Sequence, residues 1–480
     1  MAIIIPANTL ASGGYAVDNS CRFDGSSAYM HKTPGGAGNL RTFTISFWVK
    51  RSSLGQMWMF QQGADNGTDT TYLRFTPTHQ LSFADYSAGG EFELATNRLF
   101  RDFSAWYHIV VAVDTTQGTA ANRVKIYVNG VQETSFATET YPSENYDTEL
   151  NGTDLLTLCR RVDDGGSPQL YYNGYLAETV MVDGTALAPT SFGEFDEDSG
   201  IWKPIDVSGL TFGTNGFYLD FENSGALGAD VSGNTNNFTV NNLTAIDQTT
   251  DTPTNNFATL NPLGMPSTNT TFSEGNLTVN VASGSSFFSI PTIGVSSGKW
   301  YVEGKLVTAN TAGGVYYTDY GFSDRPNSAG ELLYASSGRV FWLSNWDSKI
   351  NYRTGGSTTA GLQTGKTGLS EGDFFQLYLD MDNELMYWGR NGSVTNSTGI
   401  SFNGKESLTG EYFFAFGDQY TSGTHKYSTN FGQGSIDGSA VSSYNDVNGY
   451  GNFKYNPTVS TDEGSKDFLA LCTKNLAEYG

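Results

Sequence analysis

The chain has 480 residues, too many for one ordinary hydrophobic core, so we expect two medium-sized domains. Its 49 Asp and Glu residues against 26 Lys and Arg give a formal net charge of -23, which disfavours phosphate backbones and anionic membrane surfaces as partners. No apolar run reaches the ~20 residues of a membrane-spanning helix, and three widely spaced cysteines give no disulfide framework. We therefore expect no nucleic acid and no membrane insertion.

The composition predicts an all-β chain, because Gly, Tyr, Phe, Ser, Thr and Asn are abundant in the pattern of short strands and turns. The clearest strand is 42–51, in which apolar and polar residues alternate, as a half-buried strand requires. Four of its residues are expected to face a core (Phe43, Ile45, Phe47, Val49) and three to face solvent (Thr44, Ser46, Lys50). Similar runs predict strands at 72–75, 81–84, 106–113, 124–128 and 175–182.

The same turn device occurs twice. Asn129-Gly130 follows the strand 124–128, and Asn391-Gly392 follows the apolar run that begins at Leu385. Both dipeptides tolerate positive φ and predict tight hairpins. Two antiparallel β-sandwiches are therefore predicted, one over 20–195 and one over 266–440.

Polar segments flank the two predicted sandwiches. Residues 196–265 are rich in Asn, Thr, Asp and Pro and predict an extended connector that crosses the surface. Residues 1–19 are an N-terminal arm and 441–480 a C-terminal segment, in which 467–479 comes nearest to a helix. Neither end looks able to fold alone, so we expect the ends to serve attachment.

Five stretches of the first half follow one another in a fixed order: RFDGSSAYM (22–30), FTISFWVK (43–50), WYHIVVAVD (106–114), VKIYVNG (124–130) and YYNGYLAETVMVDGTAL (171–187). In this order they resemble the laminin-G-like, concanavalin A-type lectin domains. The resemblance implies a jelly roll of two large antiparallel sheets over 20–195.

A second ordered set lies in the other half: GKWYVE (298–303), EGD (371–373), Leu379-Asp380, LMYWGRNG (385–392) and NFG (430–432). Together these motifs are similar to the strands and turns of SPRY domains. The resemblance implies a second, SPRY-like sandwich.

Three further segments are similar to recurrent segments of fibre-type virion proteins of bacteriophages: SGNTNNFTVNNL (232–243), DTPTNNFATLNPL (251–263) and FLALCTKNL (468–476). This resemblance implies a virion component with other virion proteins as partners. It also implies a homo-oligomer, with a trimer as the commonest arrangement for phage fibres.

Enzyme motifs are weak in this chain. EFDED (194–198) approaches the Glu-x-Asp-x-x-Glu strand of laminarinase-like glucanases, but it lacks the final Glu and lies in a predicted loop. AGLQTGKT (360–367) fits a loose phosphate-loop pattern without the flanking strand and helix that phosphate binding needs. His108 lies in a predicted strand and is expected to be structural. We expect no catalytic residues and no enzyme.

Laminin-G-like domains often hold Ca²⁺ at the sheet rim through oxygen ligands. The oxygen-rich loops that could do so contain Asp65, Asn66, Asp69, Asp163 and Asp164. The same residue types are what tight turns use, so Ca²⁺ binding and plain turn chemistry are both open.

Sugar binding needs an aromatic face for the C–H side of the ring and nearby polar groups for the hydroxyls. Two candidates of this kind lie in the first sandwich (Trp58, Tyr86) and six in the second (Tyr317, Tyr320, Asn345, Trp346, Asp347, Tyr352). The same side chains would equally plug sandwich edges or form contacts between protomers.

The predicted function is a phage virion fibre or receptor-binding subunit that adheres to host-surface glycans. Two alternatives remain: a purely structural capsid or tail decoration protein without sugar binding, and a polysaccharide depolymerase of concanavalin A-type fold. Head and tail location are both open.

Overall fold

The computed structural model describes residues 14–64, 69–86, 92–162, 170–264, 270–282, 287–309, 311–312, 315–316, 318–324, 340–344, 347–354, 357–402, 410–418 and 423–480. The chain is all-β as predicted, apart from short 3₁₀ turns and the helix α1 (Thr473–Tyr479). It divides into two compact units, the first ending at Asn256 and the second spanning Phe257–Gly480. Within the described ranges, no helix has the length and apolar character needed to cross a membrane.

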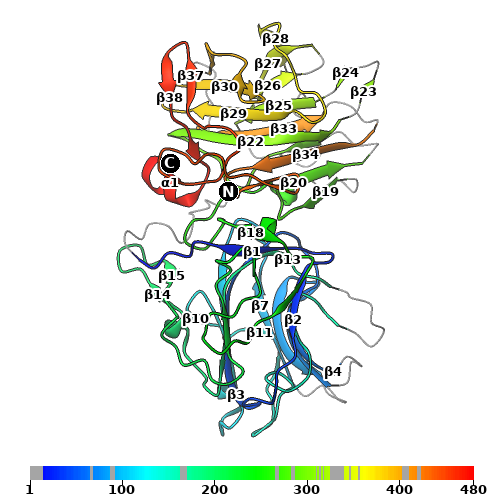
Figure 1. Cartoon of the computed structure of the whole chain (residues 1–480), viewed down its shortest axis with the longest axis vertical. Coiled ribbons are helices and arrows are strands. Elements are labelled where there is room, and N and C mark those ends of the chain that lie inside the picture. Colours follow the sequence, from blue (N-terminus) through cyan, green and yellow to red (C-terminus); the bar gives the residue numbers. More distant parts are fainter. Residues whose placement is uncertain are drawn as a thin grey trace. The chain divides into compact units, whose positions relative to one another are not determined.

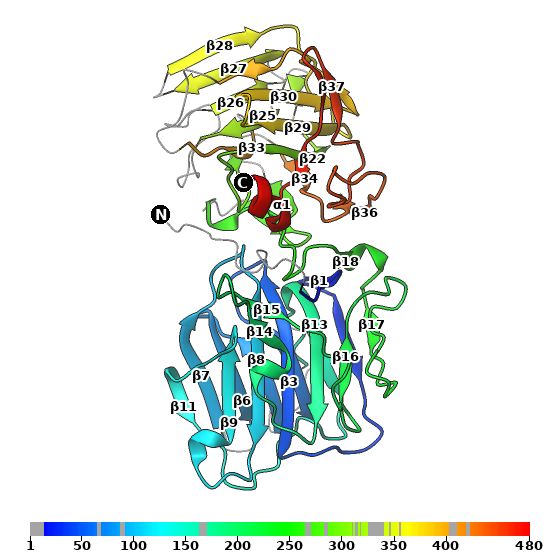
Figure 2. The same ribbon diagram turned by 90° about the vertical axis from the view of Figure 1, so that its left-hand side faces the viewer.

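The first unit is a sandwich of two antiparallel sheets (Figures 1 and 2). The first sheet has the order β10 (Val131–Gln132), β9 (Val124–Val128), β8 (Tyr107–Asp114), β3 (Thr42–Arg51), β13 (Asn173–Asp183), β1 (Ser20–Asp24) and β18 (Gln248–Thr249), and β16 (Phe217–Leu219) also pairs with β13. The second sheet has the order β11 (Phe136–Thr140), β7 (Phe92–Leu99), β6 (Gln80–Tyr86), β5 (Asp69–Phe75), β4 (Met57–Ala64), β12 (Leu156–Leu158), β2 (Tyr29–Lys32) and β17 (Thr239–Asn241). A separate hairpin consists of β14 (Gly193–Phe195) and β15 (Trp202–Pro204).

The core between these two sheets is built as the alternation predicts. All four apolar residues of β3 that were expected to face inward are fully buried: Phe43, Ile45, Phe47 and Val49. They pack with inward side chains of the second sheet such as Leu73 and Phe83. The prediction of a half-buried strand is nevertheless wrong for the other side of β3.

The outer face of the first sheet is covered rather than solvated. Thr44, Ser46 and Lys50 are no more than 1% exposed, whereas the alternation predicted that they face solvent. A second apolar layer lies on this face and includes Phe192, Trp202, Val207, Phe212 and Tyr218. Alternation within a strand predicts one apolar and one polar face. It does not reveal that later segments of the chain cover the polar face.

The predicted extended connector, 196–265, is for the most part a piece of the first sandwich. Its strand β16 pairs with β13, β17 pairs with β2 and β18 pairs with β1. Residues up to Asn256 belong to the first unit, so the prediction of an extended connector is wrong for 196–256. The Asn- and Thr-rich composition reflects turns between very short strands.

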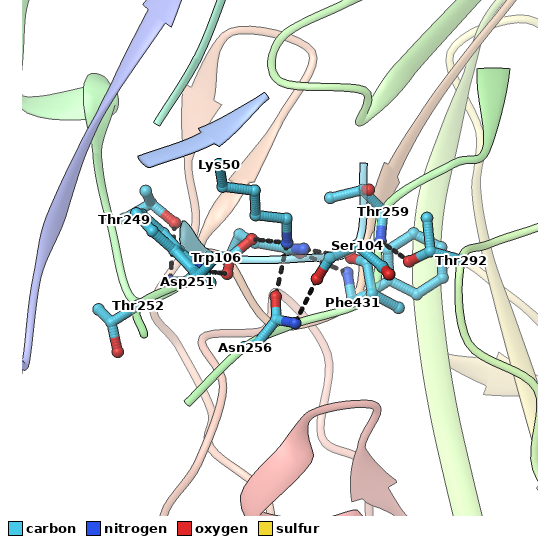
Figure 3. A network of polar contacts seen from close by, with 12 residues as sticks. Lys50, Ser104, Trp106, Thr249, Asp251, Thr252, Asn256, Thr259, Thr292 and Phe431 are labelled. Carbon is cyan, nitrogen blue, oxygen red and sulfur yellow. Dashed lines mark hydrogen bonds and ion pairs between the residues drawn. The ribbon is translucent and has the colours of Figure 1, made fainter. Parts of the chain in front are cut away.

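A buried polar network holds the end of this segment in place (Figure 3). Lys50 Nζ lies 2.7 Å from Asp251 Oδ2 and donates to Asn256 Oδ1, also at 2.7 Å. Trp106 Nε1 donates to Asp251 Oδ1 at 3.1 Å, and Asn256 Nδ2 donates to the carbonyl of Ser104 at 2.6 Å. Lys50 and Asp251 are 1% and 0% exposed, so each charge depends on its partner for stabilisation.

The second unit is also a sandwich. Its larger sheet has the order β19 (Thr270–Ser273), β20 (Thr278–Val281), β34 (His425–Asn430), β22 (Lys299–Thr308), β29 (Phe374–Asp380), β30 (Leu385–Arg390) and β31 (Ser393–Val394), with β32 (Ile400–Ser401) on β30. Its smaller sheet has the order β21 (Phe287–Ser289), β33 (Phe413–Asp418), β25 (Thr318–Ser323), β26 (Val340–Ser344), β27 (Lys349–Thr354) and β28 (Ser357–Gln363). Two-stranded hairpins are formed by β23 (Thr311–Ala312) with β24 (Val315–Tyr316), β35 (Ser435–Ile436) with β36 (Ser439–Ala440), and β37 (Val459–Thr461) with β38 (Gly464–Lys466).

The C-terminal segment 441–480 was predicted to lie outside the second sandwich, but it is an integral part of it. Its strand β39 (Leu469–Ala470) pairs in parallel with β22, and Phe468 is fully buried. The buried carboxylate of Glu303 accepts hydrogen bonds from the backbone amides of Lys454 and Tyr455 at 2.7 and 3.0 Å. This segment is therefore needed to complete the fold.

Both predicted Asn-Gly hairpins are confirmed. Asn129 and Gly130 have φ of 47° and 78°, and Asn391 and Gly392 have φ of 49° and 85°. A Cβ at Gly130 would lie 2.3 Å from the Trp202 ring, so close packing as well as backbone conformation requires glycine there.

Candidate functional site

The outer face of the second sheet gathers aromatic rings and arginines in the first unit. In β5, Leu73 and Phe75 face the core, so Tyr72 and Arg74 between and beside them face outward. The same alternation turns Trp58 outward from β4. We call this surface the Arg–aromatic face and define it by eight residues: Tyr29, His31, Trp58, Tyr72, Arg74, Arg160, Arg161 and Tyr171.

Three guanidinium groups lie over three of these rings. The Cζ atom of Arg160 is 3.7 Å from the ring centroid of Tyr29, that of Arg74 is 4.9 Å from Tyr72, and that of Arg161 is 5.5 Å from Trp58. The rings of Trp58 and Tyr72 contact one another, with centroids 4.3 Å apart. A guanidinium that lies over an aromatic ring can still donate hydrogen bonds from its N–H edge, so the three arginines form a group of donors on this face.

The cations of this array have few anionic partners. Arg74 lies 3.6 Å from Glu93, and Arg160 and Arg161 make no ion pair within the described residues. Three buried donors have no hydrogen-bond acceptor among the described residues: Trp58 Nε1, Arg74 Nε and Arg160 Nε. Unpaired donors in such a place are costly unless a ligand or solvent accepts from them.

His31 lies beside the array and is held neutral. Its Nδ1 lies 3.0 Å from Asn241 Nδ2, and because the amide nitrogen can only donate, Nδ1 is the acceptor. Burial and the nearby charge of Arg160 lower the pKa of His31. The positive charge of the Arg–aromatic face therefore comes from its arginines.

The predicted sugar-binding residues differ in how exposed they are. Trp58 is only 4% exposed beneath the arginine stack, so it is no open platform. Tyr86 at the end of β6 is 54% exposed and is free to contact a ligand. Tyr320 and Tyr352 are wrong as exposed candidates, since both lie in the core of the second sandwich and Tyr352 stacks on Phe341 with centroids 4.6 Å apart.

The other sugar candidates give little support to a site in the second unit. Asp347 is half-buried, lies 3.6 Å from Lys349 Nζ and accepts from Asn351. Tyr317, Asn345 and Trp346 lie outside the described residues. The described part of this unit therefore does not bring the predicted set together.

Calcium binding stays a prediction. Asp69 is exposed at the start of β5, whereas Asp65, Asn66, Asp163 and Asp164 lie outside the described residues. Among the residues that are described, no three His, Cys, Asp or Glu side chains are grouped as metal ligands.

His108 is structural, as predicted. It is 1% exposed, its ring stacks between Trp48 and Trp202, and its Nε2 and Nδ1 lie 2.9 Å from Ser46 Oγ and Trp202 Nε1. Because the indole can only donate, Nδ1 accepts and the proton is on Nε2. Burial lowers the pKa of His108 to about 3.

The weak enzyme motifs have structural roles in the described chain. Lys203 Nζ lies 3.3 Å from Glu194 and 3.1 Å from Asp196, so EFDED is tied into a surface ion-pair cluster. Lys366 donates to the carbonyl of Thr395 at 3.0 Å, and no helix follows it in the described range 357–402. The phosphate-loop reading fails for lack of that helix.

Sequence reasoning missed the arginines of the Arg–aromatic face. The adjacent pair Arg160-Arg161 was a usable signal, because only 26 of the 480 residues are Lys or Arg. What could not be seen is that Arg160 lies over Tyr29, more than a hundred residues earlier, because the pairing of β12 with β2 brings them together.

Comparison with known proteins places this face inside a family match. Residues 24–191 match the family model of the concanavalin A-like lectin/glucanases superfamily, and this range contains all eight residues of the Arg–aromatic face. The match covers most of the first sandwich, which ends at Asn256. A search of curated proteins gives no match.

Solved structures with similar folds include three of different kinds. The SPRY domain of human HERC1 is 20% identical, covers 33% of this chain and 91% of its own, with a TM-score of 0.27. Domains LG4-5 of mouse laminin α1 are 8% identical, and the match covers 88% of this chain and 84% of theirs, with a TM-score of 0.28. A Ruminococcus gnavus IT-sialidase CBM40 bound to α2,3-sialyllactose is 14% identical and covers 37% and 96%, with a TM-score of 0.26.

Proposed function

We propose that this chain is a non-enzymatic adhesion protein whose lectin domain binds surface glycans through the Arg–aromatic face. The stacked guanidinium groups of Arg74, Arg160 and Arg161 are the observation that supports the proposal most strongly. Guanidinium edges donate in pairs to carboxylates, sulfates or vicinal hydroxyls, and the half-buried ring of Tyr171 offers apolar surface for sugar C–H groups.

The charge of the chain bears on whether the expected glycan is acidic or neutral. Arg160 and Arg161 have no ion-pair partner among the residues that the structure describes, although the chain has a net charge of -23, and such cations favour a glycan that carries acidic groups. A general attraction to polyanions is excluded by the same net charge, so any such binding must come from a local site.

The finer proposal is that the protein is a bacteriophage virion component, either a fibre or a decoration subunit, that attaches particles to host-surface glycans. Its support is the resemblance of 232–243, 251–263 and 468–476 to segments of phage fibre proteins. Single lectin sites bind weakly, so adhesion would depend on a homo-oligomer and many copies on one particle. The buried C-terminal segment makes the N-terminal end the better candidate for attachment to the particle.

A glycan array tests the binding proposal with the full chain. The panel contains acidic polysaccharides and neutral ones of matched length, and the variant Arg160→Gln/Arg161→Gln is compared with the control Arg41→Gln/Lys299→Gln. Both variants lose two positive charges, and in the control both side chains are partly exposed in surface ion pairs.

We expect acidic glycans to bind the parent and the control. The affinity of the Arg160/Arg161 variant for them should be at least about tenfold lower, which equals a loss of about 1.4 kcal/mol in binding free energy. Absence of signal from every glycan would favour the purely structural decoration role. Release of reducing ends from any of the bound polysaccharides would contradict the non-enzymatic part of the proposal.

A further inference from the structure

A hollow of about 320 Å³ opens on the outer face of the first sheet, on the opposite side of the sandwich from the Arg–aromatic face. Its lining comes from neighbouring strands and one loop: Ala112 and Asp114 of β8, Lys125 and Tyr127 of β9, Gln117 and Asn122 of the turn between them, and Ala186, Leu187 and Ala188 after β13. We propose that this hollow is a second saccharide site, which takes one neutral hexopyranose residue.

The shape of the hollow follows from one small residue. Ala112 pairs with Lys125 in the register of β8 and β9, and its methyl group leaves a depression below the longer side chains of Lys125 and Tyr127. A volume of about 320 Å³ is at the low end of the range of about 300 to 1,000 Å³ for small-molecule sites. One sugar ring is therefore a better fit than an oligosaccharide.

The wall opposite the strands is fixed before any ligand binds. Thr44 Oγ1 donates to the carbonyl of Thr185 at 2.7 Å and accepts from the amide of Leu187 at 2.8 Å. Thr44 itself is fully buried, so these two bonds hold the 185–187 loop against the sheet. A preformed wall lowers the ordering cost of binding.

The charges in the hollow are of both signs. Burial opposes ionisation of Asp114, but hydrogen bonds from Thr116 and Gln117 outweigh it and lower the pKa of this carboxyl, which is ionised at neutral pH. Lys125 makes no ion pair within the described residues and supplies a cation on the same rim. A ligand with a net charge would be attracted by one of them and repelled by the other.

Neutral sugar hydroxyls match such a rim. A hydroxyl donates to a carboxylate and accepts from an ammonium or an amide, so one ring can satisfy Asp114, Lys125 and Asn122 together. The half-buried ring of Tyr127 and the side chain of Leu187 supply apolar surface for the C–H groups of the sugar. This chemistry differs from that of the Arg–aromatic face, so the inference does not depend on the proposed function.

Ligand-observed NMR on the full chain tests the inference, with glucose, galactose, mannose and N-acetylglucosamine as neutral probes and glucuronate as the charged one. The variants are Lys125→Gln, Asp114→Asn and Ala112→Leu, the last of which fills the hollow from its floor. The control is Arg160→Gln/Arg161→Gln, which alters only the other face, and circular dichroism verifies that each variant is folded.

We expect at least one neutral hexose to bind with a millimolar Kd, with a loss of at least about fivefold in Lys125→Gln and complete loss in Ala112→Leu. The control should bind the hexose unchanged even if it loses acidic glycans. The inference is overturned if no hexose binds, if glucuronate binds as well as the neutral sugars, or if Lys125→Gln and Ala112→Leu bind like the parent.

Discussion

At the scale of single residues, the surroundings of His108 decide its chemistry. Two indole rings cover it, and its two nitrogens are engaged by Ser46 and Trp202. The folded protein therefore keeps a neutral imidazole that the unfolded chain would protonate below its ordinary pKa of 6.5.

This difference predicts a pH dependence of stability. Because the folded pKa of His108 is about 3, the unfolded state binds more protons, and the free energy of unfolding falls as the pH drops below 6.5. Between about pH 7.5 and pH 5.5 the loss for one such histidine is about 1.4 kcal/mol. Urea unfolding of the first unit at both pH values, compared between the parent and His108→Gln, measures it.

Glu178 acts in the opposite direction, since burial raises its pKa to about 7 and its contribution grows as the pH falls through that value. The variant His108→Gln separates the two effects. Between pH 7.5 and pH 5.5, the change in the free energy of unfolding of the variant should be more favourable than that of the parent by about 1.4 kcal/mol, the amount assigned to His108. Equal pH responses of parent and variant would contradict a neutral buried His108.

At the scale of elements, the sequence predicts strands that local patterns define and misses strands that form only by pairing with distant segments. Strands β3 and β9 have the predicted bounds, because alternation over several residues and an Asn-Gly turn are local signals. Strands β16, β17 and β18 have three residues or fewer, and their partners lie in distant parts of the chain. Their own residues show no pattern long enough to be recognised.

The buried ion pair of Lys50 and Asp251 helps to hold the segment after β18, which gives a second stability prediction. Asp251→Ala removes the carboxylate that pairs with the buried ammonium of Lys50, and it removes the acceptor of Trp106 Nε1. Removing one partner of a buried ion pair costs about 3 to 5 kcal/mol. The free energy of unfolding of the first unit should fall by that amount, and its transition temperature should fall with it.

Calorimetry of the full chain measures this shift, and the transition of the second unit should stay in place. Arg41→Ala, which breaks an exposed pair with Asp147, is the matched control and should leave both transitions unchanged. An unchanged first transition in Asp251→Ala would show that the network does not hold the segment.

At the scale of the whole molecule, the fold class and both sandwiches were predictable, but the candidate site was only partly so. Trp58 lies in the Arg–aromatic face, yet the arginines that cover it come from β5 and from the chain after β12. Tyr320 looked like a loop aromatic in the sequence, whereas strand pairing of β25 turns it into the core. Which aromatic is exposed depends on long-range pairing that one sequence does not reveal.

The central claim is that the lectin domain binds a glycan through the Arg–aromatic face. A crystal structure of the full chain with the acidic oligosaccharide that gives the strongest array signal tests it most directly. We predict that an acidic group of the sugar lies within hydrogen-bond distance of Arg160 or Arg161 and that a ring of the sugar contacts Tyr171. An oligosaccharide bound only to the second sandwich, with the arginines of the first untouched, would contradict the claim.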